Sequence, residues 1–492
     1  MSTYLKRLVS ALGAYQIADA IAKVLAVLLL PVYTRYVTPV GYGVVETLAT
    51  FVIFVSIVVR FGMIESFLRF YFSDEDAGRR SALARRSVVF LLLTTTIAAA
   101  ALIAAGGPLT RLVTATDRVW TFRVAVLGVW AFTNLELAYA LLRVEERLRA
   151  YAIASVSNVG LTVASSVILV VGFKLGALGL LIANYGATLA VLLGLWWTMR
   201  HRLGVRRSGS EPLRVLLHFG LPTVPAEASV YALSVLDRQY LVHAKGASAV
   251  GFYSLALKIA GAVAFIVRAF QYAWPPLAYS VRDEREAGRL YGLVTTYYVL
   301  ISGWVVAGLA LEARWILRLL AAPRFFDSYR AVPWVSLGWA LYGLWVVLLV
   351  VAGRARVTRR NFPAALTGLG VNVALLILLV PRYGIAGAGV ALCGAYIAML
   401  GVMHLLIRRA FVVGFEWWRL AHIVAVMSLF TVLGEIFLPT RGAAGLLLRA
   451  VVFLAIPPAL LLTGFVHPEE LSGARGLIRR MRTHCVAGRG AT

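Results

Sequence analysis

Several charged side chains fall inside long apolar segments, where an uncompensated charge costs at least about 2.5–3.5 kcal/mol. In the first segment, Asp19 and Lys23 are four residues apart, so they lie on one face of a helix. Farther along, Asp237 and Arg238 precede Lys258. Arg offers a fork of donors and Lys a compact charge, so these cations suit an anionic ligand such as phosphate. The alternatives are an intrahelical ion pair for the first two and snorkelling to the interface for Lys258.

Two further cations, Arg60 and Arg268, lie near the inner ends of predicted membrane spans. Each is either a topological anchor or part of a basic binding site. Glu46 lies within the second apolar segment, and together with Asp19 and Asp237 it is a candidate for an ion pair or for binding a coupling proton or sodium ion. The other acids in or beside the apolar segments are Glu65, Glu136, Glu312 and Glu435.

The sequence predicts neither catalysis nor a metal site. The seven histidines are scattered, and none lies at metal-ligand spacing from another. The two cysteines, Cys393 and Cys485, belong to an apolar segment and to the basic tail. No connection between apolar segments is long enough to form a catalytic domain. We therefore expect no enzyme and no cofactor, with a proton gradient, a sodium gradient or the membrane potential as candidate energy sources.

Composition indicates which elements carry these charges. The 492 residues are 61% hydrophobic and only 14% charged, which is typical of an integral membrane protein. A bilayer-spanning helix needs roughly 20 apolar residues. This rule predicts an all-α polytopic protein with about fourteen spans. They cover residues 8–35, 42–62, 87–107, 119–142, 151–173, 178–199, 215–243, 248–276, 290–311, 331–353, 363–381, 384–407, 420–438 and 445–466.

The net charge of +26 comes mostly from Arg and Lys in the short connections between apolar segments. Their distribution favours an orientation with both termini in the cytoplasm. We expect these groups to contact membrane lipid headgroups rather than nucleic acid.

An internal duplication is suggested by an offset of 208 residues. Residues 174–187 then align with 382–395, with several shared Gly and Ala, and the same offset aligns Gly43 with Gly251. The abundance of Gly and Ala is the alternative explanation. Six spans separate equivalent points, so the halves would be related by a pseudo-two-fold axis along the membrane normal. The predicted parts are a six-helix lobe in 1–207, a second in 208–412, two extra helices in 413–466 and a basic tail in 467–492.

Two segments resemble the Wzx-type polysaccharide flippases. The first reads Leu30-Pro-Val-Tyr-Thr-Arg-Tyr-Val-Thr-Pro-Val-Gly-Tyr-Gly43. The second begins Phe219-Gly-Leu-Pro222, reaches Asp237-Arg238 and continues to Gly251-Phe-Tyr-Ser-Leu-Ala-Leu-Lys258. The combination and order of these degenerate motifs carry the resemblance, which extends over nearly the whole chain.

The resemblance implies the multidrug/oligosaccharidyl-lipid/polysaccharide exporter superfamily, whose members have two six-helix lobes around a cationic cavity. It implies translocation of undecaprenyl-pyrophosphate-linked repeat units across a bacterial or archaeal cytoplasmic membrane, with a polysaccharide polymerase and its assembly machinery as partners. The Asp19–Lys23 pair and the Asp237–Arg238–Lys258 group would then line the cavity, and Arg35 would gate or anchor it.

Other functions stay open. The two extra spans also resemble lipid II flippases, although their Arg-rich first helix is absent. A multidrug or cation antiporter of the same superfamily would favour an acidic cavity. A membrane polymerase or ligase would need a large external loop, and a scaffold for glycosyltransferases would need no binding site.

Overall fold

The computed structural model describes residues 27–72, 76–200 and 212–465, and within these ranges the chain is helical without strands. The helices of the first half are α2 (Leu30–Tyr36), α3 (Pro39–Val59), α4 (Met63–Tyr71), α5 (Ala77–Ala104), α6 (Gly106–Thr114), α7 (Val119–Val144), α8 (Leu148–Val167), the π-helical turn η1 (Ile168–Gly172) and α9 (Gly176–Met199). Those of the second half are α10 (Leu213–Gly220), α11 (Thr223–Lys245), α12 (Ala247–Ile259), α13 (Gly261–Ser280), α14 (Glu284–Leu320), η2 (Pro323–Arg330), α15 (Val332–Arg354), η3 (Thr358–Arg360), α16 (Asn361–Ile407), α17 (Trp417–Phe437) and α18 (Gly442–Leu462).

Local sequence signals explain where two of the long helices begin. At the start of α3, the Thr38 hydroxyl accepts a hydrogen bond from the Gly41 amide at 3.1 Å, and Pro39 occupies the first helical position. At the start of α5, the Asp76 carboxylate accepts one from the Arg79 amide at 2.9 Å. Both caps satisfy amides that the first helical turn leaves without an intrahelical partner.

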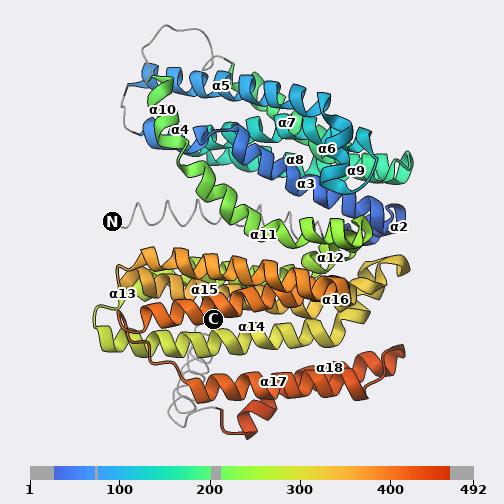
Figure 1. The fold of residues 1–492 in the computed structure, drawn as a ribbon, viewed down its shortest axis with the longest axis vertical. Coiled ribbons are helices and arrows are strands. Elements are labelled where there is room, and N and C mark those ends of the chain that lie inside the picture. Colours follow the sequence, from blue (N-terminus) through green and yellow to red (C-terminus); the bar gives the residue numbers. More distant parts are fainter. Residues whose placement is uncertain (1–26, 73–75, 201–211, 466–492) are drawn as a thin grey trace, which may run out of the picture. The chain divides into compact units, whose positions relative to one another are not determined.

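The first compact unit contains the described chain up to Ile259, together with Leu317–Ala331 and Ala374–Ala388. In it, α7 packs against α5 and α9, and α9 also packs against α8 (Figure 1). A core of buried side chains that includes Phe67, Leu91 and Leu192 joins these helices. The first unit therefore contains both α3 and the two helices α11 and α12, which lie on either side of the middle of the chain.

The second compact unit contains Ala260–Ile316, Val332–Val373 and the described chain from Gly389 onward. Its main core combines aliphatic side chains with a few aromatic ones, among which the Trp274 and Tyr291 rings lie edge to face at 4.9 Å. The helices α17 and α18 lie side by side in this unit (Figure 1). The predicted division into two six-helix lobes, an extra helix pair and a tail stays a prediction.

Ten described helices are long and apolar enough to span a membrane, or eleven if α12 and α13, which meet at a 49° bend, form one span. The all-α polytopic architecture is therefore confirmed, whereas the count of fourteen stays a prediction. Two differences from the predicted spans have identifiable reasons: most of the span at 8–35 lies outside the described residues, and α11 carries several charged side chains. The spans predicted at 363–381 and 384–407 correspond to the two parts of α16, which meet at a kink with non-helical backbone at Gly384.

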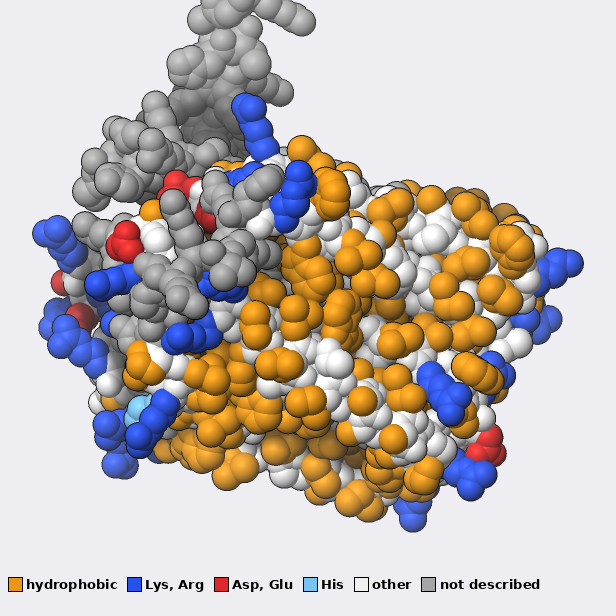
Figure 2. Space-filling view, turned by 90° about the horizontal axis from the view of Figure 1, so that it is seen from above, with side chains coloured by type: hydrophobic (Ala, Val, Ile, Leu, Met, Phe, Trp, Pro, Cys, Tyr) orange, Lys and Arg blue, Asp and Glu red, His pale blue; other side chains and the backbone are white. Residues whose placement is uncertain are grey.

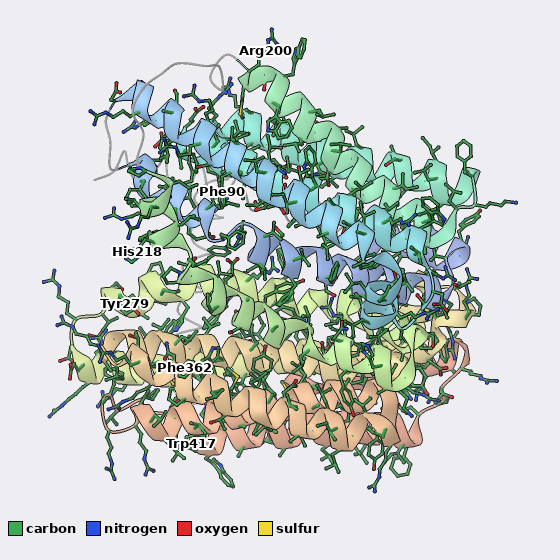
Figure 3. The ribbon with its side chains drawn as sticks, turned by 45° about the horizontal axis from the view of Figure 1, so that its top comes forward. Phe90, Arg200, His218, Tyr279, Phe362 and Trp417 are labelled. Carbon is green, nitrogen blue, oxygen red and sulfur yellow. The ribbon has the colours of Figure 1, made fainter. Side chains whose placement is uncertain are left out.

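The exterior is apolar where a soluble protein would be polar. Figure 2 shows hydrophobic side chains over most of one face, with Lys and Arg near its two ends. Large exposed apolar residues include Ile97 at 68% and Ile436 at 67%. At the end of α9, the Arg200 guanidinium stacks over the Trp197 ring at 4.3 Å from its centroid (Figure 3). An apolar belt bordered by aromatic and basic residues is typical of helices in a bilayer.

Two glycines that the duplication matches have a positive φ. Gly176, the first residue of α9, has φ +55°, and Gly384, at the kink inside α16, has φ +57°. Glycine accepts this left-handed conformation without the steric cost that a Cβ imposes. The predicted duplication aligns these two residues, and their shared conformation supports it.

Candidate functional site

The helices α3 and α12 cross at two glycines. A Cβ on Gly43 would collide with the carbonyl oxygen of Ala247, and a Cβ on Gly251 would collide with that of Pro39. The offset of 208 exchanges these two contacts, because it aligns Gly43 with Gly251 and Pro39 with Ala247. Reciprocal contacts of this kind are what a two-fold axis produces. The crossing is therefore consistent with the predicted duplication, and the close approach brings side chains of α3 and α12 together.

Lys258 forms the central ion pair beside this crossing. Its Nζ donates to Glu46 Oε1 at 2.7 Å and also to the Tyr42 hydroxyl, and it lies 4.8 Å from the centroid of the Tyr42 ring. Tyr42 is 1% exposed. The predicted candidates Lys258 and Glu46 therefore lie together and bind each other. Tyr42 was not predicted as a participant, although its position beside the matched Gly43 was a usable signal.

Asp237 and Arg238 lie in α11, next to this pair. The buried Asp237 carboxylate accepts hydrogen bonds from the Tyr253 hydroxyl at 2.5 Å and from the Arg238 amide at 2.7 Å. The Arg238 side chain lies within electrostatic range of Glu46, and its buried Nε has no hydrogen-bond partner among the described residues. Because the Tyr253 hydroxyl and the Arg238 amide satisfy the Asp237 carboxylate, the Nε of Arg238 is available to donate a hydrogen bond to a ligand.

These four side chains carry two positive and two negative formal charges. Two cations, Lys258 and Arg238, face two carboxylates, Glu46 and Asp237. The described part of the candidate site is therefore balanced rather than basic. The remaining predicted pair, Asp19 and Lys23, lies outside the described residues. A cationic cavity stays a prediction.

Arg60 belongs to a separate cluster at the bend between α3 and α4. Its guanidinium forms salt bridges with Glu65, at 3.3 Å, and with Glu227. Arg60 is 8% exposed, and Glu136 lies within electrostatic range of it. These acids neutralise Arg60 in this conformation. Glu227 was missed in the sequence, although the offset of 208 aligns it with Asp19.

The other two predicted cations are Arg268 and Arg35. Arg268 lies in α13, in the second compact unit, and has interactions of its own. Arg35 is exposed at the end of α2, where its carbonyl oxygen accepts a hydrogen bond from Arg324. A role for either residue in binding or gating stays a prediction.

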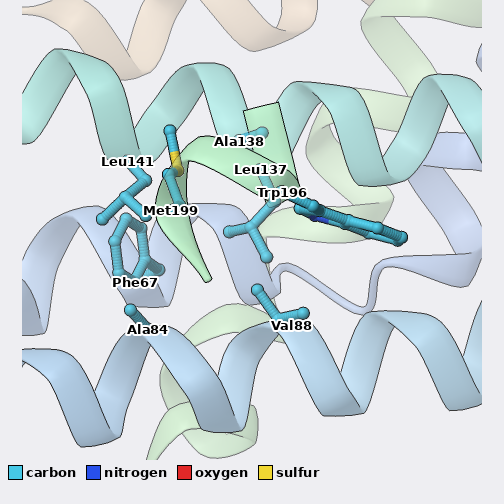
Figure 4. A pocket seen from close by; sticks show the side chains of 8 residues that line it. All are labelled: Phe67, Ala84, Val88, Leu137, Ala138, Leu141, Trp196 and Met199. Atoms are coloured by element: carbon cyan, nitrogen blue, oxygen red, sulfur yellow. The ribbon is translucent and has the colours of Figure 1, made fainter. Parts of the chain in front are cut away.

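The described residues of the first unit line at least two hollows. An apolar cavity of about 10 Å³ lies between α4, α5, α7 and α9 (Figure 4). Such a volume holds one water at most, so it is a packing gap. An open groove of about 650 Å³ follows α10 and is lined by Arg214, His218 (labelled in Figure 3) and apolar neighbours. Neither hollow contains the Lys258 pair.

A second buried ion cluster lies in the second unit. Arg449, in α18, is fully buried and donates to Glu435 in α17 and to the Leu311 carbonyl of α14 at 3.1 Å. Arg314 donates to the same Glu435 at 2.6 Å. The cluster fastens the last two helices to α14.

The fold is that of the MOP superfamily transporters. The structure is similar to one titled "Lipid II flippase MurJ, inward closed conformation", with TM-score 0.70, 11% identity, and coverage of 90% of this chain and 96% of that chain. It is also similar to an inward-facing multidrug resistance MATE family transporter of the MOP superfamily, with TM-score 0.61, 16% identity, and coverage of 81% and 94%. An outward-facing transporter of the same family gives TM-score 0.52, 15% identity, and coverage of 84% and 93%.

The chain belongs to the family described as polysaccharide biosynthesis protein, whose model matches residues 9–278, more than half of the sequence. The resemblance predicted from the two motif segments is thereby confirmed at the level of the family. No curated protein matches the chain in sequence. The protein is a multi-pass membrane protein of this family with the MOP fold.

Proposed function

We propose that the protein is a flippase that moves undecaprenyl-pyrophosphate-linked oligosaccharide repeat units across the cytoplasmic membrane for surface polysaccharide synthesis. Family membership supports the link to polysaccharide biosynthesis. The fold supports transport, because it is shared by MurJ, a lipid II flippase, and by a multidrug transporter of the MATE family. The mechanism would be alternating access of a central cavity, in which rocking of the two repeats exposes one site to each side in turn.

The observation that carries the proposal is the Lys258–Glu46 pair at the crossing of the repeats. A charged side chain within a membrane-spanning segment is costly, so the presence of Lys258 and Glu46 in such segments argues for a role in binding. In the resting site, Glu46 and Tyr42 occupy the donors of Lys258. A pyrophosphate would replace the carboxylate with further negative oxygens, and Arg238 would add its unused Nε donor. Glu46 is then a surrogate anion that the substrate displaces.

The same exchange suggests how transport could be coupled to an energy source. Once displaced from Lys258, Glu46 is free to take up a proton or a sodium ion, and Asp237 is a second buried carboxylate in the same group. A proton gradient, a sodium gradient and the membrane potential are all compatible with this arrangement. We place both termini in the cytoplasm, and we infer a polysaccharide polymerase with its assembly machinery as functional partners.

The test is a flip assay in proteoliposomes. A fluorescent undecaprenyl-pyrophosphate oligosaccharide is scored for accessibility in the far leaflet, with wild type beside Lys258→Ala and Arg238→Ala. Lys174→Asn is the matched control, because it removes an exposed lysine at φ +55°, a conformation that Asn tolerates. We expect flipping by wild type and the control, and loss in the two site variants. Normal flipping in both site variants would remove the proposed site.

The same proteoliposomes separate the competing substrates. The similarity to MurJ favours the hypothesis that the substrate is lipid II. The balanced charge of the site favours the hypothesis of a cation antiporter. Faster flipping of fluorescent lipid II than of the oligosaccharide lipid would select the first. Export of a cationic dye without flipping of either lipid would select the second and reject the proposal.

A further inference from the structure

The short helix η2, which connects α14 to α15, packs inside the first compact unit. Residues 317–331 belong to that unit, whereas the flanking parts of α14 and α15 belong to the other. Two consecutive side chains of η2, Arg324 and Phe325, make its principal contacts with the first repeat. A displacement of η2 is therefore transmitted along the chain to two long helices.

Phe325 lies between residues of the two crossing helices. Its side chain is fully buried, and its ring is edge to face with Tyr42 at 5.8 Å and with Phe252 at 6.1 Å. Tyr42 immediately precedes Gly43, and Phe252 immediately follows Gly251. A single aromatic ring thus covers the point where the two repeats meet.

Arg324 fixes the same segment to the end of α2. Its guanidinium donates to the Thr34 carbonyl from Nε at 3.1 Å and from Nη2 at 2.9 Å, and to the Arg35 carbonyl at 2.6 Å. The Ala322 amide donates to the Thr34 hydroxyl at 3.0 Å. The last carbonyls of a helix lack intrahelical partners and carry partial negative charge, so a guanidinium there is favourable.

Tyr42 connects this segment to the candidate site. Its ring packs perpendicular to that of Phe325, while its hydroxyl accepts a hydrogen bond from Lys258. An anion that captured Lys258 would take this donor away from Tyr42. The ring of Tyr42 would then be free to turn, and a turn would remove one of the two aromatic walls around Phe325.

We propose that η2 is a ligand-responsive seal, held shut by Phe325 and Arg324 and released when an anion replaces Tyr42 and Glu46 at Lys258. The nature of the anion rests on the proposed function, whereas the seal itself rests on the contacts of η2. The seal couples occupancy of the site to opening of the segment between α14 and α15. The seal therefore keeps the segment between α14 and α15 closed as long as the site is empty.

Ser328 provides a reporter within η2. It is fully buried, and its hydroxyl has no hydrogen-bond partner among the described residues, so Ser328→Cys changes little in the closed form. The full chain would carry Cys393→Ser and Cys485→Ser to remove the native thiols. In detergent micelles, the rate of modification by a polar maleimide then measures how often η2 opens.

We expect Phe325→Ala to raise this rate at least about tenfold without ligand, because large-to-small replacement removes the buried contacts of the seal. Phe326→Ala is the matched control, since the Phe326 ring contacts Tyr329 and Arg318 rather than Tyr42. Geranyl pyrophosphate should raise the rate in the reporter background but not with Lys258→Gln. An unchanged rate in Phe325→Ala would overturn the seal.

Calorimetry with geranyl pyrophosphate separates the two proposals. Binding that depends on Lys258, without any effect on the labelling rate, would overturn the ligand response while sparing the proposed function. If Phe325→Ala opens the segment but the probe does not bind, the substrate site is rejected and the response to an anion falls with it. Inorganic pyrophosphate, used in parallel, distinguishes recognition of the headgroup from recognition of the lipid.

Discussion

Gly43 and Gly251 face each other where α3 and α12 cross, and each faces the carbonyl of the residue that begins the other helix. Small residues allow helices to approach this closely, which strengthens van der Waals packing in a bilayer where no hydrophobic driving force exists between them. The crossing is the structural basis for the meeting of Lys258 and Glu46.

Alanine at either glycine of this crossing should destabilise the protein. The added methyl group would overlap a backbone carbonyl, and overpacking of this kind costs typically about 1–3 kcal/mol. Thermal unfolding in detergent, followed by size-exclusion chromatography, measures the effect. Gly194→Ala is the control, because a Cβ there meets nothing within 4 Å. If Gly43→Ala, Gly251→Ala and the control had equal unfolding midpoints, the close contact of α3 with α12 at these glycines would be contradicted.

The pairing of Lys258 with Glu46 predicts opposite effects on anion binding. Glu46→Gln removes the internal competitor, so the affinity for geranyl pyrophosphate should rise, by about tenfold if the competition is worth about 1.4 kcal/mol. Lys258→Met should abolish binding. Calorimetry gives both values, and Glu284→Gln, at an exposed acid, should leave the affinity unchanged. Weaker binding in Glu46→Gln would show that the carboxylate helps to hold the ligand.

Tyr253→Phe tests the hydrogen bond at Asp237. The change keeps the buried ring but removes the donor at 2.5 Å from a carboxylate that is 5% exposed. Loss of a partner from a buried polar group costs about 1–3 kcal/mol, so the unfolding midpoint should fall. Tyr240→Phe, on the same helix as Asp237, serves as the reference variant. A midpoint as high as that of the reference would indicate that Asp237 finds another donor.

Arg449 should be among the most sensitive residues of the second unit. Arg449→Met removes the fully buried member of the cluster, leaves Glu435 with Arg314 alone and frees the Leu438 and Pro439 carbonyls, so we expect a loss of about 1–3 kcal/mol. The double variant with Glu435→Gln should recover part of the loss. Unfolding midpoints of the single and double variants measure both effects. Arg441→Met, at an exposed position, should be neutral, and a similar loss there would argue against a specific cluster.

The helices could be predicted because membrane spans depend on local composition alone. Apolar runs of about 20 residues predict α3, α7 and α9 within a few residues of their observed ends, whereas α5 begins earlier than predicted, in its basic first turns. By contrast, the charged residues Glu227, Asp237 and Arg238 break the apolar run of α11, so this helix is less apolar than the others. The boundary between the spans predicted at 363–381 and 384–407 coincides with the non-helical backbone at Gly384 inside α16.

The partners of the charged residues could not be predicted in the same way. Lys258 and Glu46 are 212 residues apart, and their meeting depends on the rotation of two helices about their axes. Sequence periodicity places a residue on a face but does not orient that face toward a given neighbour. The offset of 208 residues is the long-range indication of contacts in the sequence, because it aligns Gly43 with Gly251 and these residues meet where α3 and α12 cross.

The balance of charge around Lys258 has an electrical consequence. The membrane potential acts on net charge with about 2.3 kcal/mol per elementary charge per 100 mV. Two cations and two carboxylates sum to zero, so these four side chains add no voltage dependence when the empty site changes sides. With a pyrophosphate bound, the site carries the charge of its cargo. In the proposed cycle, these four side chains would therefore make the step with bound pyrophosphate sensitive to voltage and add no such sensitivity to the return of the empty site.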